Sequence, residues 1–193
     1  MNNQVAVKMK SGPSIMLASG NWFDLLDPWN SEFSIEDIAQ GLANICRYSG
    51  QCVRFYSVAE HSIHVSDTVD EFKLEALLHD ATEAFLGDIT RPLKQLLPQY
   101  QEIEKSVEDA IFSRFGLEKS SKTMIKAADL SVLAAEQRQV MPIGTDYWTD
   151  GSGIQSANIC VEFLSPSVAR DRFLAKYSTL TSELHHRAGL LIR

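Results

Sequence analysis

Two histidines and two aspartates in the middle of the chain have the types and spacing of metal ligands. They are His61, the adjacent pair His79-Asp80, and Asp129. Two imidazoles and two carboxylates suit an octahedral divalent ion, with two positions left for water and substrate. Structural zinc would more often recruit cysteine, and the three cysteines of the chain are not spaced for it. The pattern predicts one divalent metal ion, with its identity open among Mn, Co, Mg, Ni, Fe and Zn.

The setting of these residues favours a metal site over a surface cluster. The segment that carries His79, Asp80 and Glu83 is strongly apolar, with Leu74, Ala76, Leu77, Leu78, Ala81, Ala84 and Phe85 around them. Asp129 is likewise bracketed by alanines and a leucine. Buried charges without partners are costly, and a metal ion is the usual partner. A buried ionic cluster is the alternative, and the metal site is preferred to it.

Helices must bring these residues together. The apolar periodicity, N-cap residues and breakers predict helices over Ser34–Gly50, Ser57–Val69, Lys73–Phe85, Glu102–Phe115, Thr123–Val140 and Ser165–His186. The linker between the second and third helices has about three residues, which favours antiparallel neighbours. At ~1.5 Å rise per residue, the rings of His61 and His79 would then lie within a few ångströms of the same height. Glu83, four residues beyond His79, would share its helical face.

The fold class expected is all-α, with a small β appendage at the N-terminus. The chain is read as one domain, 1–193, divided into an N-terminal extension (1–33), a metal-binding helical core (34–142) and a long loop with a C-terminal helix (143–193). A hairpin is expected between Val5–Met9 and Ile15–Leu17, with two tryptophans packing the extension down. The loop from Ile143 to Ser156 is too long for a simple connector, so we expect it to be functional or mobile.

Composition narrows the class of protein. The 193 residues are 45% hydrophobic and 22% charged, enough for one domain with a real core. The net charge of −7 disfavours binding to a nucleic-acid polymer, which rests on phosphate contacts. No apolar run is long enough to predict a membrane span or a signal core. An odd number of cysteines without a CxxC pair is typical of reduced thiols, so a cytoplasmic location is expected.

The wider pattern resembles the HD-domain metal-dependent phosphohydrolase superfamily. The resemblance rests on motifs in the right order: Arg47-Tyr48, residues 57–62 around His61, residues 78–84 around His79-Asp80, residues 87–94 from Gly87-Asp88 to Lys94, and residues 126–129 ending at Asp129. It covers roughly residues 40 to 142. Within the superfamily, the chain is most similar to the small branch of bacterial 5′-deoxynucleotidases and compact phage dATP triphosphohydrolases. The resemblance implies a helical HD fold, one divalent metal and phosphoester hydrolysis of nucleotides.

The resemblance also implies catalytic roles. A bound ion would polarise a phosphoryl oxygen and lower the pKa of a bound water. Glu83 is the expected general acid or base, and Asp88 the second carboxylate, which positions water or protonates the leaving oxygen. Arg47 is the expected phosphate clamp, because a guanidinium binds phosphate oxygens in pairs. From the residues alone, a cation at a helix C-terminus is the favoured interpretation of Arg47, and for Asp88 an ordinary turn residue is as well supported as a catalytic one.

Further substrate contacts are expected from residues near these motifs. They are Tyr48, His64, Asp88, Thr90, Arg91 and Lys94, with Phe55 and Trp148 as additional aromatic candidates for base stacking. The deoxynucleotidase branch has Arg-Trp where this chain has Arg47-Tyr48, and it has no counterpart of Tyr147 and Trp148. Arg91 and Lys94 could instead be solvated surface charges, and His64 could be a simple packed histidine.

The function expected is hydrolysis of the 5′ phosphoester of a deoxynucleotide by a metal-dependent enzyme. The substrate would be a monophosphate or a triphosphate, because both reactions break the bond between the 5′ oxygen and the α-phosphorus. One alternative is a catalytically silent nucleotide-binding sensor. Another is a cyclic-nucleotide phosphodiesterase, which usually carries further histidines for a second metal. The partner expected is a small-molecule nucleotide, with no membrane, and the family predicts a homo-oligomer.

Overall fold

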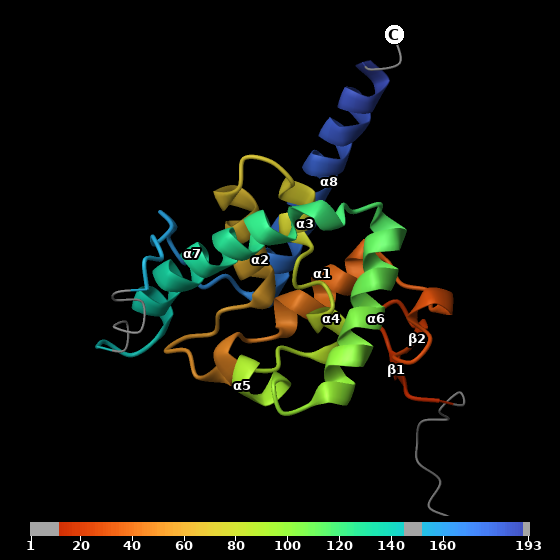
Figure 1. Ribbon diagram of the computed structural model, residues 1–193, viewed down its shortest axis with the longest axis horizontal. Coiled ribbons are helices and arrows are strands. Elements are labelled where there is room, and N and C mark those ends of the chain that lie inside the picture. The colour runs from red at the N-terminus through yellow and green to blue at the C-terminus, as the bar shows by residue number, and fades with distance from the viewer. Residues whose placement is uncertain (1–11, 145–151, 191–193) are drawn as a thin grey trace, which may run out of the picture.

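The fold is mostly helical, with one small antiparallel sheet near the N-terminus, as the sequence predicts (Figure 1). A computed structural model describes residues 12–144 and 152–190. The strands are β1 (Ser14–Met16) and β2 (Trp22–Asp24); the helices are α1 (Ile35–Asn44), α2 (Val58–Thr68), α3 (Lys73–Leu77), α4 (Glu83–Leu86), α5 (Arg91–Lys94), α6 (Pro98–Phe115), α7 (Lys122–Val140) and α8 (Pro166–Leu190). None of these helices is both long enough and apolar enough to cross a membrane.

Helix α2 lies at the centre and is packed against α1, α3, α7 and α8 (Figure 1). Its N-terminal turn is closed by Ser57, whose hydroxyl accepts a hydrogen bond from the Glu60 N–H at 3.1 Å. A serine in this position satisfies one of the free N–H groups at the start of a helix. Because α2 is enclosed on all these sides, Glu60 and His61 in its first turn are fully buried. The first metal-ligand candidate is therefore held on the most enclosed helix.

The hairpin differs from the one predicted from the sequence. Residues 1–11, which include the first expected strand, lie outside the described residues. Ile15 pairs instead with Phe23, inside a stretch expected to be a loop. Phe23 is fully buried and stacks on Phe85 with ring centroids 4.0 Å apart, so phenylalanine rather than tryptophan anchors the extension. Trp29 is 55% exposed.

Helix α1 begins as predicted but ends early. Ser34 and Asp37 form a reciprocal capping box at its N-terminus. The helix stops at Asn44 rather than near Gly50, because the following residues pair with the segment before α2: the Arg47 N–H donates to the Tyr56 carbonyl at 2.9 Å. Arg47 is therefore not a helix C-terminal cation, and that alternative reading is wrong.

The predicted helix over Lys73–Phe85 is broken in two. Residues 78–82 form turns between α3 and α4, with i→i+3 hydrogen bonds such as Ala81 N–H to Leu78 C=O at 3.1 Å. These tighter turns replace the regular i→i+4 ladder and change the chain direction. His79 and Asp80 thus lie in a turn, and Glu83 begins a new helix. The expectation that His79 and Glu83 share one helical face is wrong.

The remaining helices lie close to their predicted positions. Helix α6 starts at Pro98, earlier than expected, because proline suits the first helical position. Helix α7 starts one residue before its predicted beginning and ends at Val140 as predicted. Helix α8 runs to Leu190, beyond His186, and its C-terminal part projects from the body (Figure 1). Helix α7 carries Asp129 towards α2.

Gly41 allows α1 and α4 to lie in direct contact. A Cβ atom at this position would lie 2.8 Å from the Cα and carbonyl oxygen of Ala84. Real side chains do not approach backbone atoms so closely, so only glycine fits without a shift of α4. The contact fixes the start of α4, where Glu83 is placed.

Candidate metal centre

Three predicted ligands meet in one cluster. His61, His79 and Asp129, called the triad below, each contribute one donor atom, and these three atoms lie within 4.8 Å of one another. They come from α2, from the turn between α3 and α4, and from α7. The two imidazole rings have their centroids 5.2 Å apart. The proximity of the two histidines predicted from the sequence is therefore present, although His79 reaches it from a turn.

Both imidazoles offer the same nitrogen to the cluster. His61 Nδ1 lies 2.5 Å from Glu136 Oε1, and His79 Nδ1 lies 2.8 Å from the Ala76 carbonyl oxygen. Because carboxylate and carbonyl oxygens only accept, each Nδ1 carries a proton, and each Nε2 is the nitrogen left for a ligand. Both Nε2 atoms are buried and have no hydrogen-bond partner among the described residues. A metal ion would satisfy them.

Asp80 lies beside the triad. Its Oδ2 is 3.2 Å from His79 Nε2 and 3.6 Å from His61 Nε2. Asp80 is half-buried, and partial burial opposes its charged form, but the two histidines and Arg47 keep the pKa of its carboxyl below the usual range. The sequence prediction of Asp80 as a fourth ligand is compatible with this position.

Asp129 presents one oxygen to the cluster and the other to a lysine. Its Oδ1 is 3.3 Å from His61 Nε2, and its Oδ2 accepts from Lys126 Nζ at 2.6 Å. Burial opposes the charged form, but His61, His79 and Lys126 lower the pKa of Asp129. The aspartate is thus ionised and ready to bind a cation.

Glu136, which is not among the site residues predicted from the sequence, lies fully buried behind His61 on α7. Its Oε1 accepts from His61 Nδ1 and from the Tyr56 hydroxyl, both at 2.5 Å. Its Oε2 accepts from Arg47 Nη2 at 3.3 Å and from the Tyr48 hydroxyl at 3.2 Å. Burial opposes ionisation, but Arg47 and His61 hold the pKa of Glu136 at about 2.

The sequence holds one signal for Glu136. It is a single acid after the apolar run Val132–Ala135, two helical turns beyond Asp129 and so on the same face of α7.

Glu136 also acts on the titration of His61. Burial and the Arg47 cation favour the neutral ring, but Glu136 and Asp129 outweigh them and raise the pKa of His61 to about 9. Metal ligation needs the neutral imidazole, so binding of an ion displaces this proton.

Arg47 joins the centre from the segment between α1 and α2. Its Nη1 lies 3.7 Å from Asp80 Oδ2, while Nη2 contacts Glu136. The side chain is nearly buried, and its Nε has no hydrogen-bond partner among the described residues. This free donor next to the triad suits an oxyanion. Tyr48 is half-buried, with its hydroxyl on Glu136 and Arg47 5.5 Å from its ring centre.

Glu83 is a buried carboxylate with an unsatisfied oxygen. Lys94 Nζ lies 3.7 Å from its Oε1, whereas Oε2 has no hydrogen-bond partner among the described residues. Burial, then Asp80 and Asp88, raise the pKa of Glu83 well above the usual range. Asp88 is half-buried, and burial and Asp80 raise its pKa against the opposing Arg47 and Lys94. The charge of Asp80 thus raises the pKa of both predicted catalytic carboxyls.

Two pockets open onto the triad. One, of about 360 Å³, is lined by His79, Asp80 and Glu83 together with Lys94, Lys105 and Lys122, among others. The other, of about 380 Å³, is bounded by His79, Asp80 and Asp129 and by residues of α6 and α7, which include Lys122 and Lys126. His79, Asp80 and Asp129 are therefore accessible to small molecules, whereas fully buried His61 lines neither pocket.

Several residues predicted to bind substrate make no contact with the centre among the described residues. Thr90 and Arg91 are exposed on the segment that begins α5, and Phe55 is exposed before α2. His64 directs Nε2 towards Glu60 Oε1, at 3.8 Å, rather than towards the triad. Tyr147 and Trp148 lie outside the described residues.

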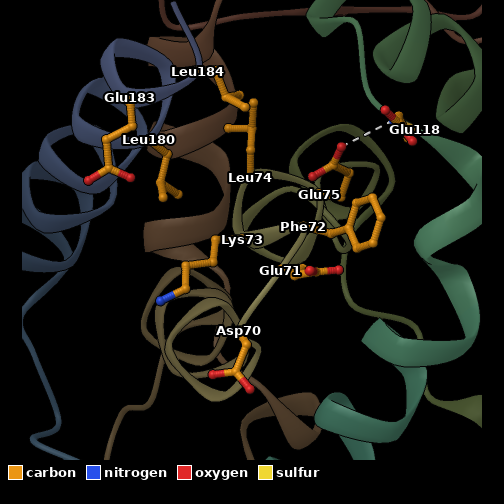
Figure 2. Close-up of a pocket in the computed structure, with 10 residues that line it drawn as sticks. All are labelled: Asp70, Glu71, Phe72, Lys73, Leu74, Glu75, Glu118, Leu180, Glu183 and Leu184. Carbon is orange, nitrogen blue, oxygen red and sulfur yellow. Dashed lines mark hydrogen bonds between the residues drawn. The ribbon is translucent and has the colours of Figure 1, made fainter. Parts of the chain in front are cut away.

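A further pocket, of about 410 Å³, is separate from the triad. Figure 2 shows Leu180, Glu183 and Leu184 of α8 on one side, and Phe72, Glu75 and Glu118 on the other. The Glu118 N–H donates to Glu75 Oε1 at 3.2 Å. Five acidic residues line this pocket, Asp70, Glu71, Glu75, Glu118 and Glu183, but no residue of the triad does. This pocket is therefore not part of the candidate metal centre.

Comparison with known proteins gives two relatives. The uncharacterized protein YfdR of Escherichia coli is 40% identical over 149 residues, 76% of this chain and 84% of its own length. The uncharacterized protein RCAP_rcc00048 of Rhodobacter capsulatus is 39% identical over 139 residues, 64% of this chain and 71% of its own length. No family model matches the sequence. At this identity and coverage, the chain belongs to the family of Escherichia coli YfdR.

Proposed function

We propose that this protein is an HD-domain metal-dependent phosphohydrolase that cleaves the 5′ phosphoester of a deoxynucleotide. The observation that carries the proposal is the His61, His79 and Asp129 cluster, in which two buried Nε2 atoms have no hydrogen-bond partner among the described residues. Two further buried atoms without such a partner, Arg47 Nε and Glu83 Oε2, belong to side chains beside it. Native structures rarely leave buried polar atoms unsatisfied, so this concentration favours a site for a metal ion and an anion.

His61, His79 and Asp129 would hold the ion, with Asp80 as the fourth ligand. The donor set of imidazole and carboxylate fits Mn²⁺, Fe²⁺, Co²⁺ or Ni²⁺. When bound, such an ion polarises a phosphoryl oxygen and lowers the pKa of water in its coordination sphere. The protonated Nδ1 atoms of both histidines keep their Nε2 atoms directed to the ligand position.

The chain's own residues supply the other parts of the reaction. Arg47, with its Nε unpartnered among the described residues, would bind the phosphate oxygens and orient the phosphorus. Glu83, whose pKa is raised, would hold a proton on Oε2 and give it to the departing 5′ oxygen. Asp88, also raised in pKa, would accept a proton from the attacking water. These two carboxyls are the proposed acid–base pair.

The pocket that holds Glu83 has room for the phosphates of a nucleotide. Three lysines line it, Lys94, Lys105 and Lys122, and each is paired with a carboxylate in this structure. They would turn to the phosphates and neutralise their charge when a nucleotide binds. Because the same bond is cleaved in both cases, a monophosphate would release orthophosphate and a triphosphate would release inorganic triphosphate. We propose either as substrate, and the products distinguish them.

The test is a hydrolysis screen with added Mn²⁺, Co²⁺ or Mg²⁺ against deoxy- and ribonucleoside mono- and triphosphates. The readout separates orthophosphate from triphosphate, and Asp129→Ala serves as the blank. Turnover that disappears in Asp129→Ala supports the proposal. Metal binding without turnover of any nucleotide overturns it and favours a nucleotide-binding sensor.

A cyclic-nucleotide phosphodiesterase receives less support. Within the described ranges, the triad is the single group of three or more such side chains that could hold a metal ion, and His64 faces Glu60 instead. A homo-oligomer stays a prediction; light scattering on the purified protein would measure its mass, and a monomer would contradict it.

A further inference from the structure

We propose that Glu136 is the positioning residue of this centre, because one buried carboxylate holds both the metal ligand His61 and the anion-binding Arg47. The inference rests on the metal site of the proposed function but not on hydrolysis. Glu136 contributes no atom to the triad, and we do not expect it to touch metal or substrate. Its role is to act through the two side chains that do.

The first contact orients His61. The Glu136 Oε1 atom lies 2.5 Å from His61 Nδ1, on the side of the ring opposite the triad. This hydrogen bond fixes both the rotation of the ring and the proton on Nδ1, so that Nε2 is presented to the ion. Carboxylates behind metal-bound histidines have this effect in metalloproteins generally.

The second contact orients Arg47. The Glu136 Oε2 atom accepts from Nη2 at 3.3 Å, while Nη1 lies 3.7 Å from Asp80. Two of the three guanidinium nitrogens are thereby turned towards carboxylates, and Nε is left without a hydrogen-bond partner among the described residues. A planar guanidinium held at two points has little freedom, so the direction of its remaining donor is fixed.

The third contact is with two tyrosines that lock the carboxylate itself. The hydroxyl of Tyr56 donates to Oε1 at 2.5 Å and that of Tyr48 to Oε2 at 3.2 Å. Tyr56 is fully buried. Each carboxylate oxygen thus has one partner in the centre and one tyrosine, and Glu136 cannot rotate without losing all four contacts.

The position of these partners shows what loss of Glu136 would do. Without the Glu136 charge, Arg47 would keep its contact with Asp80, which is itself a candidate ligand. Arg47 would then compete with the ion for Asp80. Metal binding and anion binding should therefore weaken together when Glu136 is changed.

The test is calorimetric titration of the metal-free protein with Mn²⁺ alone. Glu136→Gln keeps the size of the side chain and removes its charge. We expect its Mn²⁺ affinity to fall by about 10–100-fold, the range seen for partners behind metal ligands. The matched control is Glu60→Gln, on α2 next to His61. Glu60 is equally buried, but it accepts from the backbone N–H groups of residues 162–164.

The two variants separate positioning from general stability. Glu60→Gln should lower the melting temperature and leave the Mn²⁺ affinity unchanged. Equal Mn²⁺ affinity for folded Glu136→Gln and wild type overturns the proposal, and so does an equal loss in both variants. Binding of inorganic phosphate to the Mn²⁺-loaded proteins tests Arg47: it should weaken in Glu136→Gln, and unchanged binding overturns that half.

A measurement on the wild type keeps the test independent of whether Glu136→Gln folds. Long-range ¹H–¹⁵N spectra of the Zn²⁺-loaded protein report which histidine nitrogens carry protons and which bind metal. We expect His61 to be protonated on Nδ1 and ligated through Nε2, and the reverse assignment overturns the proposal. Because neither measurement uses turnover, a protein that binds Mn²⁺ through this network without hydrolysing nucleotides would refute the proposed function alone.

Discussion

Two fully buried glutamates, Glu60 on α2 and Glu136 on α7, have their carboxylates satisfied by different kinds of hydrogen-bond donor. Glu60 is satisfied by backbone: it accepts from the N–H groups of Glu162, Phe163 and Leu164 at 2.7, 3.1 and 2.8 Å. Glu136 is satisfied by the side chains of residues distant in sequence. Both avoid the cost of an unpaired buried charge.

The difference lies in what each glutamate leaves unsatisfied around it. The three backbone hydrogen bonds to Glu60 hold the segment before α8 against the central helix α2. They satisfy the backbone N–H groups involved. The partners of Glu136 keep atoms without a hydrogen-bond partner among the described residues, His61 Nε2 and Arg47 Nε, close to Asp80. A buried carboxylate that accepts from backbone N–H groups, such as Glu60, stabilises the fold. One that accepts from side chains with remaining unpaired atoms, such as Glu136, orients those atoms for a ligand.

The largest effect is expected at the proposed metal ligand His61. His61→Ala removes a ligand rather than its partner, so the Mn²⁺ affinity should fall by more than about 100-fold, the upper end of what an outer partner costs. Mn²⁺ titration of the metal-free protein measures it. Ser62→Ala is the matched control, because its buried hydroxyl has no hydrogen-bond partner among the described residues. Similar affinity in His61→Ala and Ser62→Ala would remove His61 from the site.

The next largest effect is a loss of stability when Glu60, the glutamate held by backbone N–H groups, is replaced. Glu60→Gln loses a charged acceptor of three backbone hydrogen bonds and places an amide N–H₂ against donors. We expect a loss of about 3 kcal/mol in the free energy of unfolding, or roughly 6–12 °C in melting temperature. Thermal unfolding followed by circular dichroism checks it. A melting temperature equal to that of the wild type would mean that these hydrogen bonds carry no stability.

A smaller loss is expected where α4 meets α1. Gly41→Ala places a methyl group 2.8 Å from the backbone of Ala84, so α4 must shift. Overpacking of this kind costs about 1–3 kcal/mol, and the shift moves Glu83. Urea unfolding measures the stability, and Mn²⁺ titration should show an unchanged affinity because α1 and α4 carry no residue of the triad. Full stability would show that α4 tolerates the methyl group.

Glu83 is a third buried carboxylate, and its replacement tests whether an unsatisfied buried oxygen lowers the stability of the fold. Since its pKa is raised in the folded state, its contribution to stability is present below the ordinary glutamate pKa and is lost as pH rises through the raised value. A tenfold difference in proton affinity between the folded and unfolded states corresponds to about 1.4 kcal/mol. Glu83→Gln should therefore melt higher than the wild type at pH 8 without metal, with the difference vanishing near pH 4. No difference at pH 8 would contradict the raised pKa.

Much of the fold could be predicted because its signals are local. Ser34 and Ser57 cap helices where a serine is followed by apolar periodicity, and α7 ends at Val140 as expected. The break between α3 and α4 could not be predicted, because residues 73–85 are rich in helix-forming leucine and alanine. The i→i+3 turns there depend on packing against α1 and α2, which no local pattern encodes.

The candidate site likewise has residues that could be predicted from the sequence and contacts that could not. His61, His79 and Asp129 could be predicted because histidines are few and lie in apolar segments. The role of Glu136 could not be identified from its single local signal, because its partners are 75 to 89 residues away in sequence. The resemblance predicts Arg47 near phosphate, whereas its contacts with Glu136 and Asp80 emerge only in three dimensions.

The central claim is that His61, His79 and Asp129 form a metal centre, and anomalous X-ray scattering from crystals soaked in Mn²⁺ tests it most directly. We predict one anomalous peak about 2.2 Å from His61 Nε2, His79 Nε2 and an oxygen of Asp129, within normal coordination distance. A peak confined to other carboxylates, such as those of the pocket beside α8, would contradict the account, as would the absence of any peak at the triad at saturating Mn²⁺.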